Sequence, residues 1–443
     1  MLSIDELRQQ TLEVLRKNDH GEYTIPAKGL YAHQWLWDSC FIAIGLRHVN
    51  IERAQHELKS LLRGQWSNGM LPNIIFAGDP WYNRDRNIWR SYLSPFSPDD
   101  VNTSGVTQPP MLAEAVVQIG KELKTAERRS WYQTMFPALV RYHLWLYADR
   151  TTPESALVTL IHPYECGLDN TPYWIDQLHK MHWPWWARLI TATHIDKAAT
   201  LFRRDTRHVP SGQRMKNIEA LLYYHWMTKI RRKQYNAPRV LKRAKFALDD
   251  LAFNSIFIRA NVHLQTIAQE IRRPLPAELI TSMAQTEKAL DELWDAYKGQ
   301  YFSRNARTKK FVREPTIATL LPLYAGCISK ERAEDLVKLL RNRHSFGANF
   351  PVPSVPFNSK YFEAHSYWQG PTWLNTNWLI IDGLQRYGFK QEAGIIRAKS
   401  LQLVRESGCY EYFSPIDGTP AGAKEFSWTA ALALDFLAQS KAG

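Results

Sequence analysis

Two acidic side chains lie in aromatic loops that are far apart in the sequence. Asp169 lies in segment 163–174, whose two prolines and one glycine indicate a rigid loop and which contains three aromatic residues. Glu411 follows a glycine helix stop and lies between two tyrosines. A carboxylate beside aromatic rings loses contact with water, which raises its pKa and makes it a proton donor near neutral pH. Alternatively, Asp169 or Asn170 only caps the helix that we expect from about residue 175.

Other loops combine aromatic rings with amide or carboxylate groups. The chain contains 17 Trp, 20 Tyr and 18 Phe, and such rings in clefts stack against sugars or bases. Segments 31–38 and 365–378 alternate aromatic and hydrogen-bonding side chains, which suits the apolar face and the hydroxyl groups of a sugar. In the alternative interpretation these aromatic residues pack in the core. We predict the following substrate-binding residues: Tyr31, Trp35, Trp37, Asp38, Tyr82, Gln108, Trp174, Tyr367, Trp368, Gln369, Trp373 and Trp428.

Segment 66–106 is too long and too aromatic for a passive connection. It contains Trp81, Tyr82, Trp89 and Tyr92 between stretches rich in Asn, Asp, Gly and Pro. We predict a lid or rim over the pocket, more mobile than the helices without ligand. A permanently packed loop is the alternative.

The elements that must position these loops are helices. Apolar residues recur three or four apart through most of the chain, strand patterns are few, as at 157–160, and no linker divides the chain. Long connections alternate with short ones, as in antiparallel helix pairs arranged in a ring with the long loops at one end. We therefore predict an all-α fold, a toroid formed by residues 1–443 as a single domain. The expected helices are 3–18, 38–48, 51–64, 109–123, 133–149, 175–200, 213–231, 248–271, 276–297, 315–326, 329–342, 371–387, 389–406 and 427–440.

Composition narrows the classes of function. The net charge of +13 is concentrated in short basic clusters between helical apolar positions, without a nucleic-acid-binding motif, so we expect a solvated basic face and no nucleic-acid partner. No apolar run is long enough to span a membrane, and the N-terminus lacks a signal-peptide pattern, so we expect a cytoplasmic protein. The four cysteines are widely spaced, and no motif indicates a metal or a cofactor. Two carboxylates in an aromatic pocket are the minimum for glycoside hydrolysis.

Five segments together resemble glycoside hydrolase family 63. They are Gln34–Asp38, Ser104–Pro110, Gly167–Trp174, Tyr367–Asn375 and Glu411–Phe413 with Phe426–Thr429, and they follow the order of the family from residue 31 to residue 429. The resemblance implies an (α/α)6 barrel and a reaction that inverts the anomeric centre. It also implies Asp169 as the general acid and Glu411 as the general base, with Glu425 as a minor alternative for the base.

The compact chain is similar to the mannosylglycerate and glucosylglycerate hydrolases of that family. The resemblance and the basic charge imply a small α-glycoside with an anionic aglycone, glucosylglycerate first and mannosylglycerate second, with Arg203 as a candidate for binding the carboxylate. We expect no cofactor and allow for a homo-oligomer. Three alternatives stay open: an α-glucosidase for neutral substrates, a sugar epimerase that uses His33, His162 and His365, and a toroid that binds sugars without catalysis.

Overall fold

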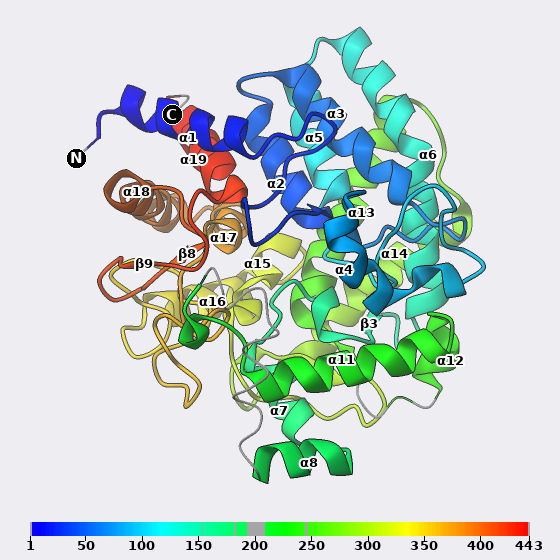
Figure 1. The fold of residues 1–443 in the computed structure, drawn as a ribbon. Helices are drawn as coiled ribbons and strands as arrows, with labels where there is room; N and C mark the ends of the chain where they lie inside the picture. The colour runs from blue at the N-terminus through cyan, green and yellow to red at the C-terminus, as the bar shows by residue number, and fades with distance from the viewer. Residues whose placement is uncertain are drawn as a thin grey trace.

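The fold is a ring of helix pairs. The computed structural model describes residues 2–152, 154–180, 183–192, 209–242, 244 and 247–441. Within these residues, six inner helices follow one another around the ring, and the last packs against the first (Figure 1). They are α2 (Leu36–Leu46), α5 (Leu112–Lys121), α13 (Leu251–Glu270), α15 (Pro322–Ala325), α17 (Leu374–Arg386) and α19 (Ser427–Lys441).

A second layer of helices surrounds the inner ring. The outer helices are α1 (Ile4–Lys17), α3 (Ile51–Leu61), α6 (Thr125–Arg150), α14 (Ala277–Ala289), α16 (Lys330–Arg341) and α18 (Lys390–Ser407). Each inner helix from α2 to α17 continues into its outer partner through a connection of only three to six residues. The predicted (α/α)6 barrel is therefore confirmed.

The long connections all lead into the N-terminal ends of inner helices, as the sequence predicts. They contain short antiparallel ladders: β1 (Gln34–Trp35) pairs with β2 (Ile74–Ile75), and β3 (Thr159–Leu160), β4 (Leu248–Asp249) and β7 (Arg304–Asn305) form a three-stranded sheet. Two further pairs are β5 (Trp294–Asp295) with β6 (Gln300–Tyr301) and β8 (Tyr412–Phe413) with β9 (Pro420–Ala421). The same connections contain the helices α4 (Asn83–Trp89), α7 (Pro172–Lys180), α8 (Trp185–Ala192), α11 (Asn217–Arg232) and α12 (Ala237–Leu241). Short 3₁₀ helices complete them: η1 (Leu62–Gly64), η2 (Pro80–Tyr82), η3 (Ser91–Leu93), η4 (Pro163–Glu165), η6 (Ser211–Gln213), η7 (Leu290–Leu293) and η8 (Ile317–Leu320).

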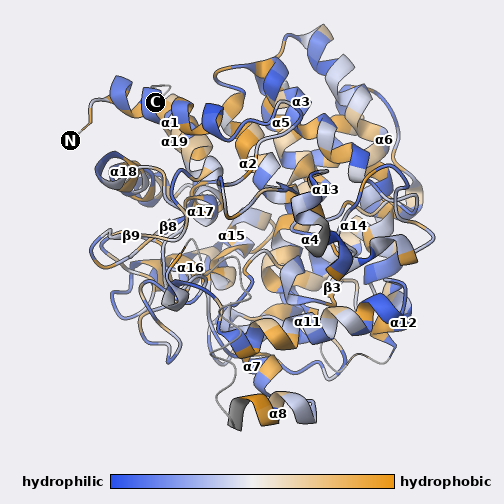
Figure 2. Ribbon diagram, viewed as in Figure 1, coloured by the Kyte–Doolittle hydropathy of each residue, from blue (hydrophilic) through white to orange (hydrophobic). Residues whose placement is uncertain are grey.

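Burial distinguishes the two layers. All residues of α2 are buried, whereas α3 buries one face and exposes the other. Hydrophilic and hydrophobic residues alternate along α11, another helix outside the inner ring (Figure 2). Buried apolar side chains from Leu7 to Phe436 form one connected core. Among the described residues, no helix combines the length and the apolar character needed to cross a membrane.

Four predicted helices have wrong boundaries. The helix expected over 276–297 ends at Ala289 and is followed by η7 and β5, and within 315–326 the α-helix starts only at Pro322, after η8. The helix expected over 133–149 begins at Thr125, because the exposed first turns of α6 lack the apolar periodicity on which the prediction depends. The helix expected over 175–200 is divided: α7 is described as far as Lys180, Trp183 and Pro184 are not helical, and α8 starts at Trp185. Residues 193–200 of the prediction lie outside the described residues. Proline lacks a backbone N–H and restrains the residue before it, so it favours a break at this point.

Candidate active site

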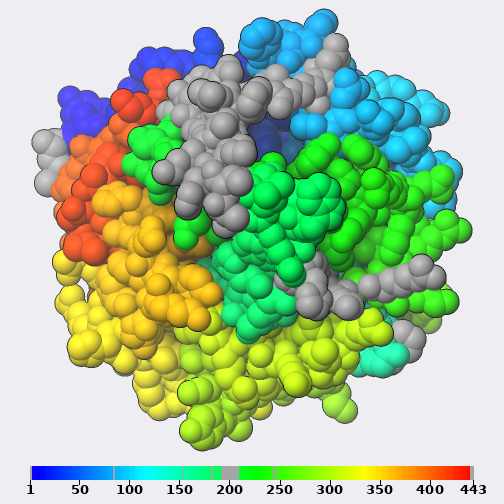
Figure 3. Space-filling model, turned by 60° about the horizontal axis from the view of Figure 1, so that its bottom comes forward, coloured from blue at the N-terminus to red at the C-terminus, as the bar shows by residue number. Residues whose placement is uncertain are grey.

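A cavity of about 510 Å³ opens where the N-terminal ends of the inner helices meet the long loops. Figure 3 shows a hollow between light-blue and green segments, with dark-blue atoms of the N-terminal part of the chain at its bottom. The wall contains residues from the start of α2, from the loops before α5 and α17, and from the start of α19. One ring closure therefore brings together side chains that are hundreds of residues apart.

Most of the predicted site residues line this cavity. They are Tyr31, Trp35, Trp37, Asp38, Tyr82, Gln108, Asp169, Tyr367, Trp368, Glu411 and Trp428. Three other predicted residues lie outside the lining and contact residues around it. The ring of Trp373 stacks on Trp368 with centroids 3.8 Å apart, Gln369 donates to the backbone carbonyl of Asn170, and Trp174 is fully buried. The predicted Arg203 lies outside the described residues.

Asp169 lies on the cavity wall, just before α7. Gly167 shapes its loop with a positive φ of 73°, and a Cβ there would lie 2.7 Å from the ring of Trp37. The hydroxyl of Tyr367 donates to Asp169 Oδ2 at 3.2 Å. Burial raises the pKa of Asp169 to about 7, against the opposing effect of the nearby Arg214 charge and the Tyr367 hydrogen bond. At neutral pH a large fraction of Asp169 is therefore protonated and able to donate.

Glu411 is buried at the start of the β8–β9 hairpin region and is held from several sides. Its Oε1 accepts from the hydroxyl of Tyr31 at 2.7 Å, and its Oε2 accepts from the backbone N–H of Ala423 at 2.9 Å. Gly422 has a φ of 75°, and a Cβ there would lie 2.6 Å from Glu411 Oε2. These contacts orient the carboxylate at the cavity wall.

Arg214 is a site residue that the sequence analysis missed. Its Nη1 lies 3.2 Å from both carboxylate oxygens of Glu411, and its Nη2 donates to the Tyr31 hydroxyl at 2.6 Å. Its guanidinium also lies over the ring of Tyr367, 4.2 Å from the centroid. The side chain is buried and lines the cavity. Its positive charge compensates the negative charge of the Glu411 carboxylate, with which it forms an ion pair. In the sequence Arg214 resembles any basic residue near a helix start, so no local signal identified it.

A row of hydroxyl groups connects the two candidate catalytic carboxylates. Asp169 Oδ2 contacts the Tyr367 hydroxyl, the hydroxyl oxygens of Tyr367 and Tyr31 are 3.5 Å apart, and the Tyr31 hydroxyl contacts Glu411 Oε1. Because these three contacts of 3.2, 3.5 and 2.7 Å follow one another, Asp169 Oδ2 and Glu411 Oε1 are at most about 9.4 Å apart. Both groups line the same cavity and can therefore reach one small ligand.

Asp38 adds a third carboxyl group to the cavity. It lies in the first turn of α2 and is buried, and burial raises its pKa well above the usual range, with smaller contributions from the charges of Glu411 and Asp169. A carboxyl group in this position is suited to hydrogen bonds with ligand hydroxyls.

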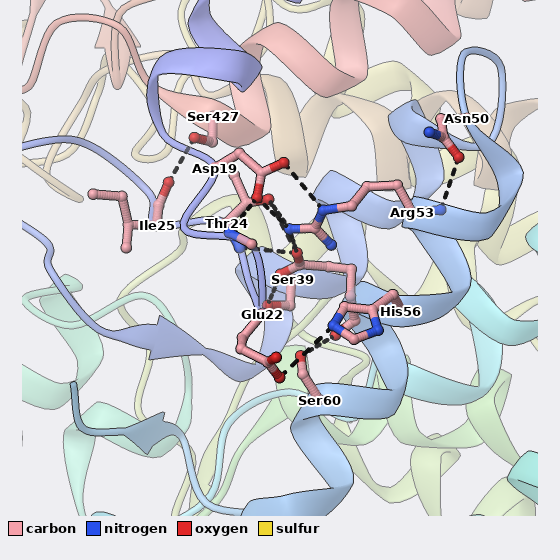
Figure 4. A network of polar contacts seen from close by, with 12 residues as sticks. Asp19, Glu22, Thr24, Ile25, Ser39, Asn50, Arg53, His56, Ser60 and Ser427 are labelled. Atoms are coloured by element: carbon pink, nitrogen blue, oxygen red, sulfur yellow. Dashed lines mark hydrogen bonds and ion pairs between the residues drawn. The ribbon is translucent and has the colours of Figure 1, made fainter. Parts of the chain in front are cut away.

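A buried polar network fixes the segment that carries Tyr31 and Trp35. Glu57 of α3 accepts from the backbone N–H of Thr24 at 2.9 Å, from the Ser39 hydroxyl at 2.5 Å and from Arg53 at 2.9 Å. Figure 4 shows the surrounding contacts, in which Arg53 also pairs with Asp19 and Ser427 donates to the carbonyl of Ile25. The cavity segment is thereby attached to α2, α3 and α19.

Segment 66–106 contributes three of its predicted aromatic residues to the cavity. Trp81, Tyr82 and Trp89 line it, whereas Tyr92 is exposed elsewhere. The end of α4 is fixed by α11 and the turn after it, since Arg231 of α11 donates to the carbonyl of Ile88 and Tyr235 of the turn donates to that of Trp89. Trp81, in η2, is 71% exposed although it lines the cavity, so this part of the segment lies at the cavity edge.

Most residues of the alternative hypotheses, Glu425 as the base and the three histidines of an epimerase, lie outside the cavity lining. Glu425 is half exposed, pairs with Lys17 at 2.8 Å and does not line the cavity. Of the three histidines considered for an epimerase, only His33 lines the cavity. His162 is buried against the carbonyl of Tyr223, and burial lowers its pKa to about 4. Within the described ranges, no group of three or more His, Cys, Asp or Glu side chains is arranged to hold a metal ion.

Comparison with known proteins matches almost the whole chain to one group. The family model described as mannosylglycerate hydrolase MGH1-like glycoside hydrolase domain matches residues 31–429. The mannosylglycerate hydrolase of Thermus thermophilus is 35% identical, over 96% of this chain and 99% of that protein. The glucosylglycerate hydrolase of Mycolicibacterium hassiacum is 30% identical, over 98% of each.

A solved structure has the same architecture. The family 63 mannosylglycerate hydrolase from Thermus thermophilus, in complex with Tris and D-glycerate, superimposes with a TM-score of 0.86 at 34% identity. The match covers 97% of this chain and 99% of that one.

Proposed function

Because the chain belongs to the mannosylglycerate hydrolase MGH1-like family of glycoside hydrolases, we propose that it cleaves a small α-linked conjugate of a sugar and glycerate with inversion. The observation that carries the proposed reaction is that Asp169 and Glu411 line one cavity, with tyrosine contacts that limit their separation to about 9.4 Å. The positive charge of Arg214 in the same cavity, where it pairs with Glu411, favours an anionic aglycone of the kind named for the two similar hydrolases.

In the proposed mechanism Asp169 is the general acid. As the bond between the anomeric carbon and the glycerate oxygen breaks, its electron pair stays with that oxygen, which takes the proton of Asp169. A pKa of about 7 keeps this proton available near neutral pH. The Asp169 carboxylate then takes a new proton from solvent.

Glu411 is the proposed general base. A water on the opposite face of the sugar attacks the anomeric carbon and transfers one proton to Glu411, which later releases it to solvent. Inverting enzymes place their two carboxyl groups roughly 6.5–9.5 Å apart, and the upper limit of about 9.4 Å set by the tyrosine contacts is compatible with that spacing. Tyr31 and Arg214 hold the base in place.

The relatives support mannosylglycerate as the first substrate to test and glucosylglycerate as the second, the reverse of the order expected from the sequence. The relative named mannosylglycerate hydrolase is 35% identical and the one named glucosylglycerate hydrolase is 30% identical. The two sugars differ only in the orientation of one hydroxyl group, so we propose that both fit the cavity and that turnover ranks them.

The test is a substrate panel followed by NMR. It contains mannosylglycerate, glucosylglycerate, methyl α-mannoside, maltose and free mannose, and the spectra report the anomer that forms first. We expect the glycerate conjugates to be cleaved fastest, with the β-anomer as the first product. Faster cleavage of maltose would support the neutral α-glucosidase, and isomerisation of a free sugar without cleavage would support the epimerase.

We also propose that segment 66–106 closes over bound substrate. Trp81 and Tyr82 at the cavity edge support a moving part near η2, whereas the contacts of Arg231 and Tyr235 fix the end of α4. Hydrogen exchange with and without D-glycerate tests this proposal. We expect slower exchange around residues 77–86 with the ligand, and equal exchange in both states would contradict the lid.

A further inference from the structure

A buried ion pair lies behind the loop of Asp169 and outside the cavity lining. Arg150 is the last residue of α6, and Glu165 is the last residue of η4. Their side chains are 1% and 0% exposed. Arg150 Nη2 lies 2.7 Å from Glu165 Oε1, and Arg150 Nη1 donates to Glu165 Oε2 at 2.9 Å. The Arg150 guanidinium also lies over the ring of Trp145, 5.0 Å from the centroid. Such a pair has a fixed geometry.

Glu165 holds the backbone that leads to Asp169. Its Oε2 accepts from the N–H of Ile161 at 2.8 Å and from the N–H of His162 at 3.3 Å. The loop then passes through the tight turn at Gly167, against Trp37, and reaches Asp169 four residues after Glu165. The Tyr223 hydroxyl fixes the carbonyl of Asp169 at 2.7 Å. The Asp169 loop is thus braced before and after its turn.

The same carboxylate reaches a second cavity loop. Glu165 Oε1 accepts from the N–H of Thr107 at 3.4 Å, next to Gln108 of the cavity lining. The Thr107 hydroxyl and the Gln108 carbonyl both contact the hydroxyl of Tyr142. Glu165 therefore sets the Asp169 loop relative to the loop before α5.

We propose that Arg150 and Glu165 are a positioning pair, which fixes where the proton donor Asp169 meets the glycosidic oxygen of the substrate. The inference rests on the proposed role of Asp169 as general acid. A fully buried ion pair is a weak source of stability, because removing both charges from water offsets much of their attraction. Its defined geometry has a clear use here, because catalysis depends on the placement of reacting groups within fractions of an ångström.

The proposal predicts a loss that depends on the leaving group. Departure of the glycerate oxygen requires a proton from Asp169, so a displaced Asp169 slows this step. Fluoride leaves as a stable anion with little help from an acid, so the glycosyl fluoride of the same sugar tolerates the displacement. A merely structural role would slow both substrates equally.

The experiment compares mannosylglycerate with α-mannosyl fluoride in Glu165→Gln and Arg150→Lys. Glu165→Gln keeps the shape of the side chain and removes its charge, and Arg150→Lys keeps the charge and removes the paired contacts. We expect kcat on mannosylglycerate to fall about 10- to 100-fold, with kcat on the fluoride and KM for both substrates changed less than about threefold. Activities are expressed per folded enzyme, from circular dichroism and thermal melts.

Glu114→Gln is the matched control. Glu114 is another buried carboxylate in an ion pair, 2.6 Å from His263, and it does not line the cavity. We expect this variant to change stability and to affect both substrates equally. The comparison therefore separates the positioning role from the general cost of removing a buried charge.

Asp169→Asn distinguishes failure of this inference from failure of the proposed function. If Asp169→Asn shows the leaving-group dependence and the pair variants show equal losses or none, the positioning role is overturned and the general acid stands. If Asp169→Asn shows no such dependence, the proposed acid itself is wrong. If only Arg150→Lys folds, that variant decides. If neither pair variant folds, the pair maintains the fold and the proposal is overturned.

Discussion

Replacing Asp169 by Asn should stabilise the protein above neutral pH. Burial raises the pKa of Asp169 from 3.8 to about 7 in the folded protein, so the folded state holds the proton more tightly than the unfolded chain. The contribution of this proton binding to the free energy of unfolding is complete below pH about 4 and is lost as the pH rises through about 7. At pH 8 the wild-type protein carries the cost of an ionised, desolvated Asp169, which the neutral Asn avoids.

The size of this effect follows from the pKa difference. A shift of about three units corresponds to a ceiling of about 4 kcal/mol. Asp169 is partly exposed to the cavity, where water solvates its charge, so we expect about half of that, about 2 kcal/mol. Asn keeps an oxygen that accepts from Tyr367, so the variant should nearly match the wild type at pH 4, where Asp169 is protonated in the folded state and about half protonated in the unfolded state.

Denaturant unfolding of both proteins at pH 4 and pH 8 measures the effect. Asp417→Asn is the control, because backbone and side-chain hydrogen bonds from Thr419 and Ser414 lower the pKa of this exposed carboxyl group to about 2. Ionised Asp417 contributes to the free energy of unfolding at neutral pH, and this contribution is lost in acid, the opposite of Asp169. Asp417→Asn should therefore not stabilise the protein at pH 8. Equal stabilisation by Asp169→Asn at both pH values would refute the argument, because ionisation would then not be its cause.

Three further predictions concern activity and the ring. Asp169→Asn and Glu411→Gln should each lower kcat at least about 100-fold, and wild-type kcat/KM should fall above pH about 7 as Asp169 loses its proton. A near-normal rate in either variant would remove that residue from its role. Arg214→Met should lower kcat/KM on mannosylglycerate about 30-fold more than on methyl α-mannoside. This factor corresponds to about 2 kcal/mol for a charged hydrogen bond. Equal losses on the two substrates would mean that Arg214 only supports Glu411. Asp435→Asn should lower the free energy of unfolding by about 3 kcal/mol with unchanged activity per folded molecule, since this buried carboxylate joins Arg47, His48 and Trp378; unchanged denaturant midpoints would contradict this expectation.

The sequence by itself determined the helical ring and the two loops with candidate catalytic carboxylates. Helix periodicity, caps and breakers are local, so the positions of α2, α16 and α19 follow from residues a few positions apart. The alternation of long and short connections is also visible in the chain, and it places Asp169 and Glu411 at one end of the ring.

Only the tertiary structure decided what surrounds those carboxylates. Arg214 contacts Glu411 across 197 positions of sequence, and nothing near Arg214 distinguishes it from other basic residues. Closure of the ring brings the two residues together, so no local pattern contains the contact. The pKa of Asp169 likewise depends on desolvation and on the charges of Arg214 and Glu411, which exist only once the loops meet. The residue types are therefore a property of the sequence, and their chemistry is a property of the assembled cavity.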